Sequence, residues 1–201
     1  MLQSEKQQFG LDPDFLLIAY CHGYFPMADH RTGPIKWYSP HPRAIIPLNG
    51  LRISRSLRRT LRKNLFALRI NSAFEQVMRA CANRDETWIS EEIISAYVEL
   101  HRRGYAHSVE TWYEGQLVGG LYGVAIGGAF FGESMFSHMT DASKVALVHL
   151  VERLRERRFL LLDTQYLTEH LARMGAIEIS RSAYLKLLSQ ALQVETSFAD
   201  E

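Results

Sequence analysis

The sequence has no apolar run that approaches the roughly 18–20 residues needed to span a bilayer. Its densest apolar stretch, Phe159–Leu162, is only as long as a strand. The first six residues, Met1–Lys6, are polar and lack the apolar segment of a secretory signal. Two cysteines, Cys21 and Cys81, are too few for a disulfide framework. The lack of a membrane span, of a signal segment and of a disulfide framework predicts a cytoplasmic protein with no membrane contact and with both thiols reduced.

Motifs of cofactor and covalent chemistry are also missing. There is no G-x-x-x-x-G-K-[ST] phosphate loop and no G-x-G-x-x-G fingerprint. The run Gly132–Phe136 resembles the G-x-S-x-G elbow of serine hydrolases but ends in phenylalanine. The eight histidines show no H-E-x-x-H spacing and the cysteines no C-x-x-C, so Cys21 beside His22 is a weak metal signal. We predict a protein with no metal and no cofactor.

The composition and the residue patterns of the chain predict one α+β protein of medium size. The 201 residues are 47% hydrophobic, enough for a real core. Prolines and a glycine between residues 24 and 42 predict a loop, and Pro40–Pro42 marks a junction between a small N-terminal domain, 1–42, and a main domain, 43–201. Caps, periodicity and turn dipeptides predict helices at 13–22, 55–63, 74–81, 91–103, 141–158, 168–174 and 181–192, and strands at 43–48, 66–70, 107–113, 116–126, 129–136 and 159–166.

The order of these elements suggests a fold. Two antiparallel hairpins followed by helix, strand and helix are compatible with the acyltransferase fold of the N-acetyltransferase (GNAT) superfamily, by analogy of pattern alone. Those enzymes usually carry a glycine-rich loop for the coenzyme's pyrophosphate before the helix that follows the central strand. The corresponding stretch, 137–143, contains no glycine, so the coenzyme cradle is not expected here.

Charge is distributed unevenly, although the net charge is only +1. Residues 31–74 hold ten Lys or Arg and no Asp or Glu, which leaves 13 basic against 22 acidic residues elsewhere. Within this segment, Ser54 is predicted to cap a helix whose buried stripe is Leu57 and Leu61. The exposed arc is either a solvated face or, as the lack of acids favours, a phosphate-backbone site. Its five cations are Arg55, Arg58, Arg59, Arg62 and Lys63.

Two carboxylates stand inside apolar strands. Glu133 lies within 130–136 and Asp163 follows three leucines at 160–162. A charge in such a strand is costly unless it is paired or used, so each marks either an ion pair at a strand end or a functional site. Their position beside the expected central strands favours a site. Asp163 and Gln165, two apart on one strand, are expected to face the same side.

Nine runs of residues carry a resemblance to a known family. They are Gly23–Pro26, Trp37–Ala44, Ile53–Ser56, Thr87–Ile89, Gly104–Glu110, Leu117–Val124, Phe131–Ser137, Ala142–Lys144 and Asp163–Gln165. On these runs the chain resembles the bacterial leucyl/phenylalanyl-tRNA–protein transferases over nearly its whole length. It departs from them at Met27, where many members have tryptophan, at Tyr38 in a common Trp-Trp pair, and at Thr164, where cysteine is usual.

The resemblance implies an activity. Members move leucine or phenylalanine, with methionine as a further candidate donor, from aminoacyl-tRNA to proteins with N-terminal Arg or Lys, which marks those proteins for the N-degron pathway. It also implies a small N-terminal domain, a C-terminal domain of the acetyltransferase superfamily, and a monomer. The ester is already activated, so positioning and proton management suffice for the chemistry.

The resemblance also implies roles for individual residues. Glu133 would hold the α-amino group of the ester, and Asp163 would orient Gln165, whose carbonyl would align or help deprotonate the attacking amine. The expected substrate-binding residues are Trp88 at the terminal adenosine, Leu121 and Phe130 in the side-chain pocket, and Phe25 and Met27. The five cations of residues 55–63 would hold the acceptor stem of the tRNA.

Two other functions remain open at this point. An acyl-CoA-dependent N-acyltransferase would share the fold class, and the missing glycine loop argues against it. A non-catalytic RNA-binding module would share the basic helix. Transfer of leucine from Leu-tRNA to a peptide that begins with Arg distinguishes the family's reaction from both.

Overall fold

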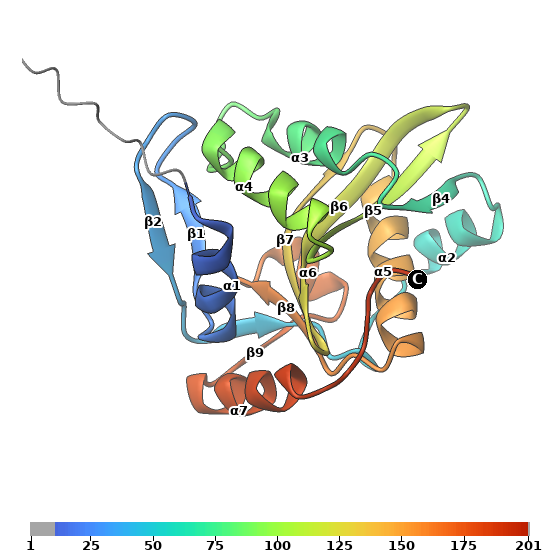
Figure 1. Cartoon of the computed structure of the whole chain (residues 1–201). Coiled ribbons are helices and arrows are strands. Elements are labelled where there is room, and N and C mark those ends of the chain that lie inside the picture. The colour runs from blue at the N-terminus through green and yellow to red at the C-terminus, as the bar shows by residue number, and fades with distance from the viewer. Residues whose placement is uncertain (1–10, 201) are drawn as a thin grey trace, which may run out of the picture.

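The computed structural model describes residues 11–200, so the expectation about Met1–Lys6 lies outside the described residues. Within them, seven strands form one mixed sheet in the order β4-β5-β6-β7-β8-β3-β9 (Figure 1). All neighbouring pairs are antiparallel except β7 and β8. The helices are α1 (Pro13–Cys21), α2 (Arg55–Arg62), α3 (Phe74–Ala82), α4 (Glu91–Arg102), α5 (Ala142–Glu156), α6 (Glu169–Arg173) and α7 (Arg181–Leu192).

The strands confirm the α+β class and most of the predicted order. They are β1 (Phe25–Ala28), β2 (Ile35–Tyr38), β3 (Arg43–Ile45), β4 (Ala67–Ile70), β5 (Ala106–Tyr113), β6 (Gln116–Ile126), β7 (Ala129–Ser137), β8 (Leu161–Gln165) and β9 (Ile177–Ile179). The predicted hairpin turn joins β5 to β6, where Glu114 and Gly115 both have positive φ. The first strand of the sheet, β3, ends at Ile45, shorter than the predicted 43–48, and Pro47, which lacks an N–H, follows closely.

The prediction of a loop over residues 24–42 is wrong. These residues contain the antiparallel hairpin of β1 and β2, a two-stranded sheet of its own. Pro26 lies within β1 opposite Trp37, a position that a two-stranded edge tolerates. The three-residue strand β9 was also not predicted, because two of its residues are exposed and no apolar alternation marks it.

Local sequence signals set the helix ends as predicted. Asp12 caps α1, with Pro13 at its first position, and its carboxylate accepts a hydrogen bond from the Asp14 N–H at 2.8 Å. Ser54 caps α2 in the same way, with 3.1 Å from its Oγ to the N of Leu57. These caps satisfy backbone donors that a helix otherwise leaves free.

Two apolar layers hold the sheet between helices. On one face, α1, α3, α4 and α7 pack with the β1–β2 hairpin around a core that includes Tyr20, Tyr97 and Phe131. On the other face, α5 covers β5, β6 and β7, and its core includes Leu147, Leu150 and the Leu57 of α2 (Figure 1). The N-terminal elements therefore share their core with the main sheet.

Candidate active site

The two central parallel strands separate at their carboxyl ends. Pairing of β7 with β8 joins Ala129–Phe131 to Leu161–Asp163 and goes no further. On its other side, β7 pairs Gly132 with Gly123 and Ser134 with Tyr122, so Glu133 is the extra residue of a β-bulge. At the bulge the backbones approach closely, since a Cβ at Gly123 would meet the carbonyl oxygen of Phe131 and the ring of Phe130. The sheet thus opens beside Glu133.

A cavity of about 350 Å³ occupies this opening. Five leucines from the strands, from α5 and from α6 give it an apolar wall, while Glu133 and Gln165 lie at its polar side. The leucines are Leu121, Leu147, Leu150, Leu162 and Leu171. A mostly apolar pocket with a few convergent polar groups is the usual form of a small-ligand site.

Glu133 is held by neutral donors rather than by a cation. Its Oε1 accepts hydrogen bonds from the Tyr20 hydroxyl at 2.5 Å and from Gln165 Nε2 at 3.0 Å, and Tyr20 is hydrogen-bonded in turn to Tyr97. Burial raises the pKa of Glu133 from 4.5 to about 7, against the lowering effect of the hydrogen bonds. Burial and the Glu133 charge also raise the pKa of Tyr20, which keeps this phenol a donor. Glu133 therefore changes charge near neutral pH.

The cavity collects polar atoms that lack partners. Within the described residues, Tyr122 Oη, Glu133 Oε2, Thr164 Oγ1 and His170 Nε2 are buried without a hydrogen bond, and all four residues line this cavity. Buried polar atoms are nearly always bonded, and a cluster of exceptions needs an explanation. A polar ligand group, or water that it displaces, supplies one.

The second carboxylate lies behind this cavity. Asp163 is fully buried and forms an ion pair with Arg43, with 2.9 Å from Nε to Oδ1 and 2.7 Å from Nη2 to Oδ2. It also accepts from the Tyr184 hydroxyl at 2.7 Å and from the backbone N–H of Gln165 at 2.8 Å. Because Gln165 has φ of 65°, strand alternation ends there, and its carboxamide turns to Glu133. Asp163 therefore reaches Gln165 through the backbone.

The predicted site residues fall into two groups. Glu133, Gln165, Trp88, Leu121 and Met27 line the cavity together. The other three predicted residues near this site, Asp163, Phe25 and Phe130, do not. Phe25 lies under the Arg43 guanidinium, 4.9 Å from its ring centroid. Phe130 is fully buried in the α5 layer, 5.1 Å from the Phe198 ring.

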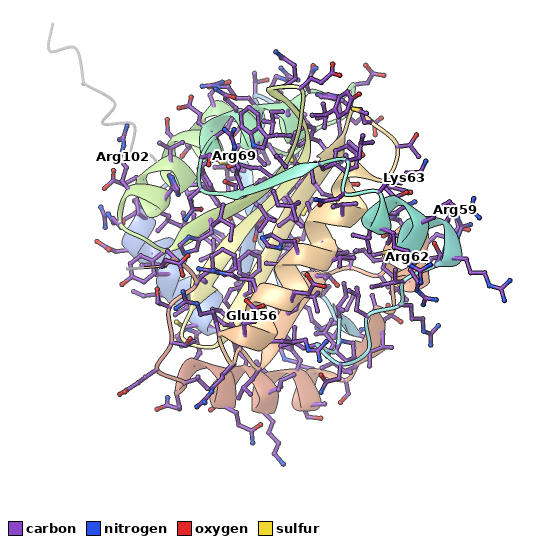
Figure 2. The ribbon with its side chains drawn as sticks, turned by 90° about the vertical axis from the view of Figure 1, so that its right-hand side faces the viewer. Arg59, Arg62, Lys63, Arg69, Arg102 and Glu156 are labelled. Atoms are coloured by element: carbon purple, nitrogen blue, oxygen red, sulfur yellow. The ribbon has the colours of Figure 1, made fainter. Side chains whose placement is uncertain are left out.

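The basic helix α2 presents its cations to solvent. Arg55, Arg58, Arg59, Arg62 and Lys63 are exposed, while Leu57 is buried. Figure 2 shows Arg59, Arg62 and Lys63 projecting from this helix. Not all of the ten basic residues at 31–74 belong to such a surface: Arg43 is 1% exposed and neutralised by Asp163, and Lys36 pairs with Asp29 at 2.7 Å.

Sequence reasoning missed Arg43, Tyr20, Tyr97, Tyr184 and His170. The tyrosines carry no local signal, since they reach the carboxylates across 113 residues for Tyr20 and 21 for Tyr184. For Arg43 a signal existed: it opens the apolar run Arg43–Ile46, and a charge in an apolar strand is the same observation that selects Glu133 and Asp163.

Over residues 11–200, no group of three or more His, Cys, Asp or Glu residues is placed to hold a metal ion. Over the same range, none of the helices has the length and apolar character that crossing a membrane requires.

Comparison with known proteins identifies the family. The family description "Leucyl/phenylalanyl-tRNA protein transferase" matches residues 45–189, and that of its N-terminal domain matches residues 10–41. The chain belongs to the leucyl/phenylalanyl-tRNA–protein transferase family, an enzyme family. Proteins with that name from Gloeobacter violaceus and Rubrobacter xylanophilus are 54% and 56% identical to it, over 94% of this chain and 97% and 99% of theirs. The one from Paramagnetospirillum magneticum is 57% identical, over 94% of this chain and 93% of its own.

Among solved structures, the chain is similar to L-PGS from Bacillus licheniformis. The TM-score is 0.41 at 15% identity, over 89% of this chain and 63% of that one. This likeness is too weak to support an argument about function.

Proposed function

We propose that the protein transfers leucine or phenylalanine from aminoacyl-tRNA to the α-amino group of an acceptor protein. The observation that carries this is one cavity in which an apolar wall of leucines faces the free Oε2 of Glu133. The apolar wall accommodates the side chain of leucine or phenylalanine. The Glu133 carboxylate accepts hydrogen bonds from the α-amino group beside that side chain. Family membership supports the same reaction.

The chemistry follows from the ester. The acceptor's amine nitrogen attacks the carbonyl carbon of the aminoacyl ester, an amide C–N bond forms, and the C–O bond to the ribose breaks. The amine gives up a proton, and the ribose oxygen takes one up. Gln165, fixed by Asp163 through its backbone and by Glu133 through its carboxamide, aligns the amine. Trp88 and Met27, which line the cavity, receive the terminal adenosine, and Leu121 contacts the side chain of the transferred amino acid.

Further features belong to the same proposal. The acceptors begin with Arg or Lys and are thereby marked for degradation, and the enzyme acts as a monomer in the cytoplasm without a metal or cofactor. The main domain, residues 43–201, is GNAT-like, and the parallel β7–β8 pair and the covering helix α5 favour this assignment. A smaller domain, residues 1–42, precedes it in the sequence. The α2 cations hold the acceptor stem by phosphate contacts.

A transfer assay tests the function. Radiolabelled Leu-tRNA, a peptide beginning with Arg and the protein should give labelled peptide, also in EDTA. The same peptide with an acetylated N-terminus is the matched control and should stay unlabelled, because it has no free amine. No labelling of the free peptide contradicts the proposal. Tight tRNA binding without transfer would indicate an RNA-binding module, and labelling from an acyl-CoA would indicate the other transferase class.

A further inference from the structure

A second hollow adjoins the cavity and shares residues with it. This groove has a volume of about 400 Å³ and lies between the end of α3, the end of β7 and the start of α5. Arg84, Met135 and His170 line both the groove and the cavity. The groove and the cavity are therefore neighbours that have these three residues in common.

The groove is lined by donors and by no described acidic residue. Asn83, Arg84 and His138 are exposed along it, and Ser143 lines its far side. The Arg84 Nη2 donates to the carbonyl of Met135, which holds the guanidinium in place, while Nε and Nη1 make no hydrogen bond within the described residues. A fixed guanidinium with free N–H groups is a good partner for a phosphate.

The charge of the groove comes from Arg84. Lys144, which follows Ser143, pairs with Asp141 at 2.7 Å, so these two charges offset each other. None of the described residues that line the groove is acidic. The Arg84 guanidinium is therefore the charge that favours an anion.

The same contact ties the groove to the basic helix. Asp141 also accepts a hydrogen bond from Thr60 on α2 at 2.9 Å, which fastens α2 to the start of α5. In Figure 2, Lys63 and Arg62 project from α2 beside this helix. The groove and α2 therefore both adjoin the start of α5.

We infer that this groove binds the phosphodiester of the nucleotide that precedes the terminal adenosine, so that the single-stranded 3′ end runs from the cavity through the groove to α2. The inference rests on the proposed function, because the cavity must hold the aminoacyl-adenosine end. The groove then has a function that neither the cavity nor the α2 cations have. It orients the single strand between the reacting ester and the duplex held by α2.

Three donors of increasing length test the inference. They are leucyl-adenosine, leucyl-cytidylyl-adenosine, which adds one phosphodiester, and Leu-tRNA. For the wild-type protein, kcat/KM with the dinucleotide should exceed that with the adenosine by about tenfold, the scale of one charge-assisted hydrogen bond. The dinucleotide's advantage should decline with salt at a log–log slope of roughly 0.7, the value for one single-strand phosphate.

Two variants place a negative charge in the groove. Asn83→Asp is nearly isosteric at an exposed position, and His138→Asp is a second, independent change. Each should reduce the dinucleotide-to-adenosine ratio to near one. Asn49→Asp, the same change at an exposed asparagine on the loop after β3, is the matched control and should keep the wild-type ratio. Arg59→Ala should keep that ratio too and lose activity only with Leu-tRNA.

The outcomes separate the two proposals. A wild-type protein that uses no donor contradicts the proposed function itself. A wild-type protein that uses adenosine and dinucleotide equally well overturns the groove alone, as does an undiminished ratio in both Asn83→Asp and His138→Asp. A ratio lost equally in Asn49→Asp overturns it as well, since a general charge effect then explains the loss.

Discussion

Arg43 and Asp163 form a buried ion pair between strands β3 and β8 of the sheet, and both side chains are at most 1% exposed. The two residues lie 120 positions apart and occupy neighbouring strands, β3 and β8. Asp163 completes its hydrogen bonds with the Tyr184 hydroxyl and the Gln165 N–H. The pair therefore fixes the end of β8, where Gln165 turns toward the cavity.

Arg43→Met should destabilise the protein by about 3–5 kcal/mol, because it leaves the Asp163 carboxylate buried without a countercharge. The double variant Arg43→Met with Asp163→Asn removes both charges and should regain most of that loss. Urea unfolding at constant pH measures both. A single variant no less stable than the double variant would show that the unpaired Asp163 carboxylate is not what destabilises the protein.

Glu133→Gln should be more stable than the wild type at alkaline pH. Because the pKa of Glu133 is raised from 4.5 to about 7, the folded protein keeps a proton that the unfolded chain loses between these values. Stability then falls as pH rises through that window, and glutamine removes the fall. We therefore expect a gain of about 1–2 kcal/mol at pH 8 and little at pH 4. Thermal unfolding against pH checks this.

The matched control is Glu156→Gln, at the exposed end of α5 (Figure 2). It should show no such pH-dependent gain. The same Glu133→Gln protein should bind the aminoacyl end more weakly, by about tenfold or more in KM for leucyl-adenosine, because a charged partner of the amine is lost. Equal stability difference at pH 4 and pH 8 would refute the titration of Glu133.

Gln165→Ala should lower kcat by about a hundredfold while leaving the Kd for tRNA nearly as it was. The carboxamide touches Glu133 inside the cavity, which no α2 cation lines, so its loss disturbs alignment rather than tRNA binding. Single-turnover transfer and a filter-binding titration measure the two quantities. Gln190→Ala, exposed on α7, is the control. Wild-type kcat in Gln165→Ala would remove this residue from the mechanism.

Leu150→Phe should shift donor preference from phenylalanine toward leucine. Leu150 lines the cavity wall from α5, and the larger ring takes up space that a phenylalanine side chain needs. The kcat/KM ratio of leucine to phenylalanine donors should rise about tenfold or more, within the range for one misfitting group. Leu185→Phe, exposed on α7, should keep the ratio. If Leu150→Phe and Leu185→Phe change this kcat/KM ratio equally, the cavity does not hold the donor side chain.

Arg59→Ala should weaken tRNA binding mainly at low salt. Loss of one duplex phosphate contact reduces the slope of log affinity against log salt by about 0.9, equally for Leu-tRNA and Phe-tRNA. Arg102→Ala on α4, away from α2 in Figure 2, is the control and should keep the slope. Transfer from leucyl-adenosine, which lacks the stem, should not show the Arg59→Ala loss. An unchanged slope with a lost leucyl-adenosine rate would place α2 at the chemistry instead.

The sequence by itself determined the local elements and the kind of chemistry. Asp12 and Ser54 specify helix starts because capping acts within three residues, and Glu114-Gly115 specifies a hairpin for the same reason. Leu57 marks the buried stripe of α2, so the exposure of its cations followed from helix periodicity. The family resemblance could be recognised from the sequence because its motifs are contiguous runs of residues.

Only the tertiary structure decided how the site works. It paired Arg43 with Asp163 across 120 residues and gave Glu133 only neutral donors, Tyr20 across 113 residues and Gln165 across 32, and no local pattern encodes these contacts. It folded residues 25–38 into a hairpin against prolines that predict a loop, because packing on α1 and the shared core outweighs local propensity. The bulge at Glu133 and the positive φ of Gln165 likewise arise where strands part. Burial and neighbours, set by packing, therefore gave two similar carboxylates different roles.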